Sequence, residues 1–396
     1  MNKCELLAPS GDMECIKTAV SFGADAVYIG GTFMQLRAKN VGFTMETIKE
    51  AADFLHANGK KLYVTVNSFA KNEEIPLLAP YAKELLSLGV DAAIVSDIGA
   101  VYAMKSAVPE LEIHISTQAN CQNYKAAEMY YNMGASRVVL GRELSLEEIK
   151  EIRALAPKEL ELEAFIHGAM CMSYSGRCMI SAFLNGRSAN RGECTQPCRW
   201  QYHLVEQTRP NTFIPVEIED GSTAILSSAD LKTISFIDDI VSAGINSLKI
   251  EGRMKTPYYV GTVVNAYRHA LDKTAPLEIL EHELECVSHR PYSSGFYFGE
   301  LKTAAPNDGA YHQDCVFVGV VKDCENGILT LEQRNKFVKG DELEILSPNS
   351  IGEKFVVSEM HDINGEEVLE ASHAQQILKI PCDLKLSNGD ILRKRK

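Results

Sequence analysis

The 396-residue sequence contains no apolar stretch long enough to cross a membrane, and its first residues lack the apolar run of a signal peptide. We therefore expect no membrane attachment and a cytoplasmic protein, in which thiols stay reduced. The HExxH helix of zinc proteases and the GxSxG turn of serine hydrolases are also missing, so two common peptidase mechanisms find no support. Cations are outnumbered, with 40 Lys and Arg against 53 Asp and Glu. Contact with nucleic acid must then come from local basic patches.

The chain is instead rich in cysteine within one stretch, Glu163–Trp200. Four of its eleven cysteines lie there: Cys171, Cys178, Cys194 and Cys198. Thiolates that converge in a loop rich in Gly and Ser can bind a soft metal or an iron–sulfur cluster. Their spacing matches neither the paired CxxC of zinc ribbons nor the run of bacterial ferredoxins. The spacing therefore predicts a four-thiolate site without choosing between zinc and iron–sulfur, and buried unconnected thiols remain the simpler alternative.

Positive charge gathers in the same region. From Cys171 to Trp200, four arginines stand against one acid, Glu193: Arg177, Arg187, Arg191 and Arg199. This local reversal of sign indicates an anionic ligand beside the cysteines. The terminal run Arg393-Lys394-Arg395-Lys396 is a second candidate patch for RNA.

Short β-rich runs alternate with amphipathic helical runs up to about residue 271, which is the pattern of parallel strands joined by helices. Seven such runs precede residue 170, and the runs near Ala224 and Ser247 bring the candidate strands to nine, whereas a closed (β/α)8 barrel has eight. We assign the β-like runs 201–205, 213–217 and 224–226 to a small antiparallel insertion, and we take SLKIEGR, from Ser247, as the eighth barrel strand. A nine-stranded open sheet is the alternative.

This assignment predicts a TIM-like (β/α)8 barrel over residues 1–275. The barrel includes a cysteine-rich and β-hairpin insertion at 168–228, directly after the seventh strand. Residues 276–308 are expected to form a linker. Residues 309–396 contain short β-like runs separated by Asn-Gly and Gly-Asp turns, which predicts a small all-β barrel.

Active sites of such barrels lie at the C-terminal ends of the strands, where this chain carries polar residues. The predicted catalytic residues are Asn67, Gln118, His167 and Glu251. The predicted substrate-binding cations are Arg142, Arg177, Arg191 and Arg253, because a guanidinium binds carboxylates and phosphates in bidentate fashion. The alternatives stay open: strand ends often simply meet water, a lone histidine is as often structural, and a single arginine usually sits in an ion pair.

The stretch EAFIHGAMCMSYSGRCMIS, residues 163–181, resembles the signature of the collagenase-like peptidases, peptidase family U-32. The resemblance extends along nearly the whole chain, through LAPSG, DAVYIGG, ISTQANCQN, KIEGRMK and EQRNKFVKGDELEI. Because the chain carries the longer C-terminal part, it is most similar to the branch that modifies tRNA.

This resemblance implies a [4Fe–4S] cluster, rather than zinc, on Cys171, Cys178, Cys194 and Cys198. It implies tRNA as partner, formation of 5-hydroxyuridine at the wobble position, and prephenate as co-substrate. A partner subunit of the same family is a further expectation, and the oligomeric state is left open. A collagenase-like peptidase of unknown mechanism is the alternative function, and a non-catalytic RNA-binding protein is the second alternative.

Overall fold

The computed structural model describes residues 4–36, 42–171, 173–200, 204–205, 213–214, 229–299, 311–348 and 350–396. The chain forms two compact units. The barrel unit comprises Met1–Ile16, Ala24–Lys255 and His289–Tyr311, and the C-terminal unit comprises Lys17–Gly23, Thr256–Ser288 and His312–Lys396. No helix in these described parts is both long enough and apolar enough to span a bilayer.

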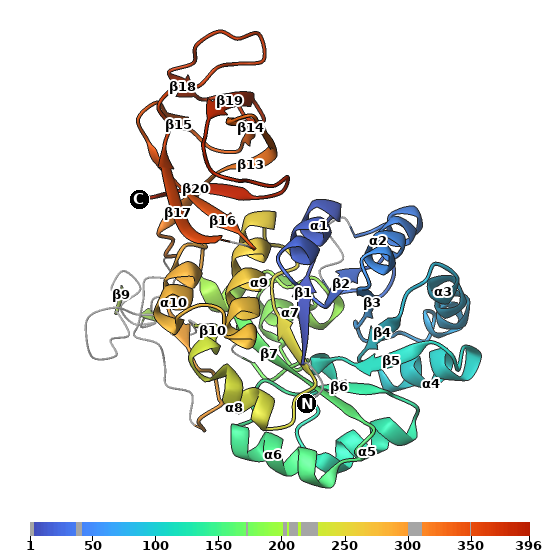
Figure 1. Ribbon diagram of the computed structural model, residues 1–396. Coiled ribbons are helices and arrows are strands. Elements are labelled where there is room, and N and C mark those ends of the chain that lie inside the picture. Colours follow the sequence, from blue (N-terminus) through green and yellow to red (C-terminus); the bar gives the residue numbers. More distant parts are fainter. Residues whose placement is uncertain are drawn as a thin grey trace. The chain divides into compact units, whose positions relative to one another are not determined.

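Eight parallel strands form the centre of the barrel unit (Figure 1). They are β1 (Glu5–Pro9), β2 (Ala26–Gly30), β3 (Lys61–Val66), β4 (Ala92–Val95), β5 (Glu112–Ile115), β6 (Arg137–Val139), β7 (Glu161–Ala169) and β11 (Ser247–Ile250). β11 pairs in parallel with both β1 and β7, so the sheet closes on itself. The prediction of a TIM-like barrel with SLKIEGR as its eighth strand is confirmed, and the open nine-stranded alternative is wrong.

The helices between the strands bury apolar stripes, as their sequence period predicts. They are α1 (Met13–Ser21), α2 (Met45–Ala57), α3 (Ile75–Ser87), α4 (Ile98–Ala107), α5 (Tyr124–Asn132), α6 (Leu146–Leu155) and α8 (Ile237–Ser242). α6 begins with the predicted capping box, in which the Ser145 hydroxyl and the Glu148 carboxylate each accept from the other's backbone N–H. Local sequence therefore fixes where this helix starts.

The long connection after β7 holds the cysteine loop, here residues 170–200. It contains α7 (Ile180–Asn185) and the short 3-10 helices η2 (Ala189–Arg191) and η3 (Pro197–Arg199). A hairpin follows, in which β8 (Leu204–Val205) and β9 (Phe213–Ile214) pair antiparallel as predicted. The third predicted run, 224–226, lies outside the described residues. β10 (Asp230–Lys232) then pairs antiparallel with β7, and β12 (Tyr292–Ser293) extends the sheet beyond β10.

The C-terminal unit is built on an antiparallel sheet, which confirms the all-β prediction for residues after 311. Its strand order is β17-β16-β20-β13-β14-β19, and β15 and β18 form a separate pair. The strands are β13 (Cys315–Glu325), β14 (Ile328–Gln333), β15 (Phe337–Val338), β16 (Glu342–Ser347), β17 (Ser350–Val356), β18 (Glu370–Ala371), β19 (Ile377–Pro381) and β20 (Ile391–Arg395). Helices α9 (Pro257–Asp272) and α10 (Leu277–Glu285) belong to this unit, so the predicted linker 276–308 contains a helix.

The terminal basic run is not a free surface patch. The Arg393 side chain is fully buried, and its Nη1 donates to Glu283 Oε2 at 2.9 Å while its Nε donates to Glu344 Oε2 at 3.1 Å. Arg395 Nε also donates to Glu344, at 3.0 Å. The expectation of an RNA patch here is therefore wrong for Arg393, because two carboxylates already hold its charge inside the unit.

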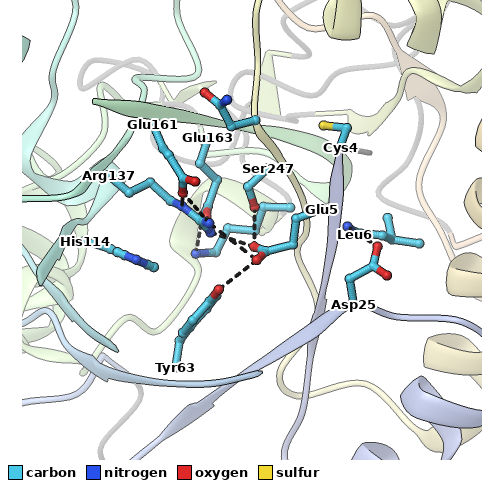
Figure 2. A network of polar contacts seen from close by, with 12 residues as sticks. Cys4, Glu5, Leu6, Asp25, Tyr63, His114, Arg137, Glu161, Glu163 and Ser247 are labelled. Carbon is cyan, nitrogen blue, oxygen red and sulfur yellow. Dashed lines mark hydrogen bonds and ion pairs between the residues drawn. The ribbon is translucent and has the colours of Figure 1, made fainter. Parts of the chain in front are cut away.

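A network of buried charges lies inside the barrel, and Figure 2 shows it from close by. Arg137, at the start of β6, donates to Glu5 at 2.6 Å, to Glu161 at 2.6 Å and to Glu163 at 3.1 Å. Glu163 in turn accepts from Lys249 Nζ at 2.8 Å. Because Glu5, Arg137 and Glu161 are the first residues of their strands, the network occupies the N-terminal half of the barrel, and it passes through Glu163 to Lys249.

Candidate functional site

A cavity of about 110 Å³ lies among the residues that end or follow the barrel strands. We call it the barrel-mouth cavity. Four predicted site residues line it from three different strand ends: Asn67 after β3, Arg142 after β6, and Glu251 and Arg253 after β11. Gln118, in the 3-10 helix η1 (Thr117–Ala119) that follows β5, also lines it. This is the end of the barrel at which the sequence placed the site.

Cations dominate the barrel-mouth cavity. Arg142, Lys249 and Arg253 line it against a single carboxylate, Glu251. The Arg142 guanidinium lies 5.1 Å above the Phe165 ring and donates to the backbone oxygen of Ala169 at 3.1 Å. Burial tends to lower the pKa of Arg142, but the neighbouring Cys171 and Glu251 outweigh that effect and raise the pKa. The arginine therefore stays charged, and the cavity suits an anionic ligand.

Arg253 holds Gln35 and Leu36, in the segment after β2, against the cavity. Its guanidinium donates to Gln35 Oε1 and Thr65 Oγ1, both at 3.1 Å, and to the backbone oxygen of Leu36 at 2.6 Å. Gly30 allows this approach, because a Cβ there would lie 1.8 Å from Gln35 Oε1 and 2.4 Å from Arg253 Nη1. Arg253 thus shapes one wall of the cavity.

A second cavity, of about 150 Å³, lies beside the first and is lined by the cysteine loop. All four predicted ligands face it: Cys171, Cys178, Cys194 and Cys198. This cysteine-lined cavity shares Leu36, Gln118 and Cys171 with the barrel-mouth cavity. A group bound by the four thiols would therefore lie next to a ligand in the barrel mouth.

Specific contacts hold the cysteine loop on the barrel. Ser175 N–H donates to Glu143 Oε1 at 2.8 Å, and the Ser175 hydroxyl lies 3.2 Å from the same oxygen. Gly176 has a φ of +73°, and a Cβ there would lie 2.0 Å from the backbone oxygen of Gln118. Only glycine combines that conformation with that close approach. The first half of the loop is therefore pressed onto the barrel mouth.

The four thiols are not in disulfides, and each is exposed or half-buried. A zinc ion bound by four thiolates would hold neighbouring sulfurs about 3.8 Å apart, since Zn–S bonds are about 2.3 Å in a tetrahedron. Within the described residues, the one set of three Cys, His or acidic donor atoms that lies within 4.8 Å is Cys286, Cys315 and Glu344, outside this loop. No three of these described loop sulfurs thus lie within 4.8 Å of one another, and a donor set of four thiols is one that an iron–sulfur cluster takes.

His167, Arg177 and Arg191 line neither cavity. The pairing of β7 with β11 is irregular: Phe165 lies opposite Lys249, but the next residue of β11, Ile250, lies opposite His167. One residue of β7 is therefore skipped in the pairing. The extra residue reverses the alternation of side chains, and His167 packs 5.5 Å from the Tyr292 ring instead of entering the mouth. Burial lowers the pKa of His167 to about 3, so its imidazole is neutral.

The two arginines have other surroundings. Arg177 is exposed on the loop. Arg191 Nη2 donates to Glu74 Oε1 at 2.7 Å and so anchors the loop to the start of α3. Both positions match the ion-pair or surface alternative that the sequence left open.

Sequence reasoning missed Lys249 and Glu143. Lys249 is 4% exposed in an otherwise apolar strand, and such a lysine requires a buried anion, here Glu163. That signal was available in the sequence. The contact of Glu143 with Ser175 depends on how the loop folds back, which no local pattern encodes.

The protein is thus a closed (β/α)8 barrel with two adjoining ligand cavities, one cationic and one lined by thiols. Its family follows from two matches: residues 11–306 match the model described as "Peptidase family U32", and residues 313–393 match "Peptidase family U32 C-terminal domain". The chain belongs to peptidase family U32.

Several named proteins are similar over nearly their full length. "tRNA hydroxylation protein P1" of Bacillus subtilis (strain 168) is 39% identical, with 100% of this chain and 95% of that protein covered. "tRNA hydroxylation protein P" of Escherichia coli (strain K12) is 33% identical, with 99% and 97% covered. A protein named "Collagenase" from Porphyromonas gingivalis (strain ATCC BAA-308 / W83) is 31% identical, with 99% and 98% covered.

Proposed function

We propose that this protein is an RNA-modifying hydroxylase that forms 5-hydroxyuridine at the wobble position of tRNA, with an iron–sulfur cluster on Cys171, Cys178, Cys194 and Cys198. The proposal rests on one observation: Cys171 and Gln118 line both cavities, so ligands in the two cavities would be neighbours. The tRNA target follows the names of two relatives that match nearly the whole chain.

The cysteine-lined cavity supports the cofactor. A [4Fe–4S] cluster takes four thiolates, and four thiols line this one cavity. When bound, such a cluster would supply electron transfer, which amino-acid side chains do not provide. Cys171 would place it against the barrel mouth.

The barrel-mouth cavity supports an anionic co-substrate. Prephenate, which carries two carboxylates, is our proposal for this ligand. Arg142 would hold a carboxylate at the border of the two cavities, and Lys249 offers a second positive charge from the cavity floor, where Glu163 fixes its Nζ at 2.8 Å. Glu251 and Gln118 would orient the remaining polar atoms of the co-substrate or of the target base.

The outer surface of the cysteine loop supports RNA as the substrate. Tyr174, Phe183 and Trp200 are 60%, 89% and 46% exposed. Tyr174 lines the cysteine-lined cavity itself, and η3, next to Trp200, packs against α7, which carries Phe183. Exposed aromatic rings beside arginines such as Arg177 stack on unpaired bases, at about 1–3 kcal/mol per base. An anticodon base is unpaired and can turn out of its loop toward the cavity.

The test is nucleoside mass spectrometry of tRNA from a strain that lacks the gene. We expect 5-hydroxyuridine and nucleosides derived from it to disappear, and to return with the wild-type gene. Cys178→Ser should fail to restore them. Cys4→Ser is the matched control, because Cys4 is also half-buried in the barrel unit but lies outside both cavities.

Unchanged wobble nucleosides in the deletion strain would contradict the proposal. The collagenase-like alternative is tested with the same purified protein on gelatin. Cleavage that Ser175→Ala abolishes would favour a peptidase, whereas in the structure Ser175 is 2% exposed and pairs with Glu143 rather than with a histidine.

A further inference from the structure

Two cysteines of the C-terminal unit lie in contact, although neither belongs to the cysteine loop. Cys286 caps the C-terminal end of α10, and Cys315 is the first residue of β13. Their sulfur atoms are 2.9 Å apart, and both side chains are fully buried. In a disulfide the sulfurs are about 2.05 Å apart, so the two atoms need to approach by only about 0.9 Å.

Two arginines lie beside the pair, and both donate to Glu344. Arg395 Nη2 lies 3.8 Å from Cys286 Sγ, and the buried guanidinium of Arg393 lies nearby. The hydrogen bond with Cys286 lowers the pKa of the Cys315 thiol, and Arg393 and Arg395 act in the same direction. The same hydrogen bond raises the pKa of Cys286. Cys315 is therefore the more acidic thiol of the pair.

A metal ion is a poorer match for this place. Glu344 brings a third donor atom within 4.8 Å of the two sulfurs. Its carboxylate, however, already accepts from Arg393 Nε at 3.1 Å and from Arg395 Nε at 3.0 Å. A divalent cation would sit beside two guanidinium groups and compete with them for the same oxygens.

We propose that Cys286 and Cys315 are a peroxide-sensitive dithiol that closes reversibly to a disulfide. The Cys315 thiolate attacks one oxygen of hydrogen peroxide, the O–O bond breaks, and the leaving hydroxide is protonated to water. The sulfur of Cys286 then attacks the Cys315 sulfenic acid, and the hydroxyl leaves with the Cys286 proton as a second water. Two thiols are oxidised by two electrons in total, and one peroxide is reduced to two waters.

The disulfide would join α10 to β13 across 29 positions of the chain. Closing a loop of that length restricts the unfolded chain, so the oxidised C-terminal unit should unfold at a higher temperature, by several degrees. A dithiol reductant should reverse both the bond and the shift.

The experiment uses the full-length protein and graded hydrogen peroxide, followed by alkylation of the remaining thiols and peptide mass spectrometry. We expect the peptide cross-linked through Cys286 and Cys315 to form at peroxide concentrations at least tenfold below those that oxidise Cys324 or Cys382, two other cysteines of this unit. Cys286→Ser should leave Cys315 as a sulfenic acid that dimedone traps. Cys324→Ser, the matched control, should cross-link like the wild type.

Other outcomes would overturn the proposal. Cys286 and Cys315 could remain fully alkylated up to the concentration that oxidises Cys382, or they could pass to sulfinic acids without a cross-link. The wild-type cross-link decides the question by itself, so the result does not depend on how well Cys286→Ser folds.

Discussion

Replacing Glu163 with glutamine tests the charge network that supports the barrel mouth. Glu163 is fully buried and pairs with Lys249 at 2.8 Å and with Arg137 at 3.1 Å. Burial alone would raise its pKa, but Lys249 and Arg137 outweigh burial and lower the pKa from 4.5 to about 2. A shift of that size corresponds to about 3 kcal/mol of stability at neutral pH. Because Glu163→Gln also leaves two buried cations short of an anion, we expect a loss of about 3–5 kcal/mol.

The sign of the pH dependence follows from the lowered pKa. Glu163 contributes its full stability above about pH 4.5, and that contribution is lost as the pH falls toward 2. The difference in unfolding free energy between wild type and Glu163→Gln should therefore be largest at pH 7 and shrink in acid. Urea unfolding followed by circular dichroism at pH 7, 5 and 3 measures it.

Glu161→Gln provides the matched control. Glu161 pairs with the same Arg137 at 2.6 Å, but its side chain is 47% exposed. Solvent screens such a pair, so the loss should stay below about 1 kcal/mol. The reasoning is refuted if the two variants lose equal stability, or if Glu163→Gln keeps the wild-type free energy of unfolding at pH 7.

Three further predictions concern the loop and the cavities. Gly176→Ala should lower the cofactor content several-fold, because the new Cβ would lie 2.0 Å from a backbone oxygen. Gly186→Ala is the control: its φ is +65° but the space around it is open, so only backbone strain remains, at about 1 kcal/mol of stability. Metal analysis and thermal unfolding compare the two variants. Arg191→Ala breaks the 2.7 Å ion pair with Glu74 and should speed proteolysis of the loop, which limited trypsin digestion measures. The global free energy of unfolding should change by less than about 1 kcal/mol, as urea unfolding would show. Arg253→Lys removes a fork of donors and should weaken binding of a dicarboxylate by about tenfold in calorimetry; unchanged affinity would remove this residue from the site.

The barrel could be predicted from the sequence because its determinants are local. The capping box of Ser145 and Glu148, the apolar period of each helix and the β-rich runs all act over a few residues. The eighth strand was found by counting, since a closed barrel requires a fixed number. The grouping of four cysteines in one stretch likewise pointed to the loop that lines the second cavity.

What the sequence did not reveal depends on distant partners. Arg393 looks like a surface cation until Glu283, 110 positions away, is brought against it. Cys286 and Cys315 belong to no motif, and only the fold places them together. His167 was expected at the barrel mouth because it lies at a strand end, but one irregular pairing in β7 turns it the other way. Register shifts of this kind cannot be derived from side-chain period alone.

The central claim is that one inorganic group, held by four thiols, borders the barrel mouth. Its most direct test is iron and sulfide analysis, with an absorption spectrum, of the anaerobically purified full-length protein. We predict about four iron and four sulfide per chain with broad visible absorption, and loss of both in Cys171→Ser, Cys178→Ser, Cys194→Ser and Cys198→Ser but not in Cys4→Ser. Stoichiometric zinc without iron, or iron that persists when any two of the four cysteines are replaced, would contradict the account.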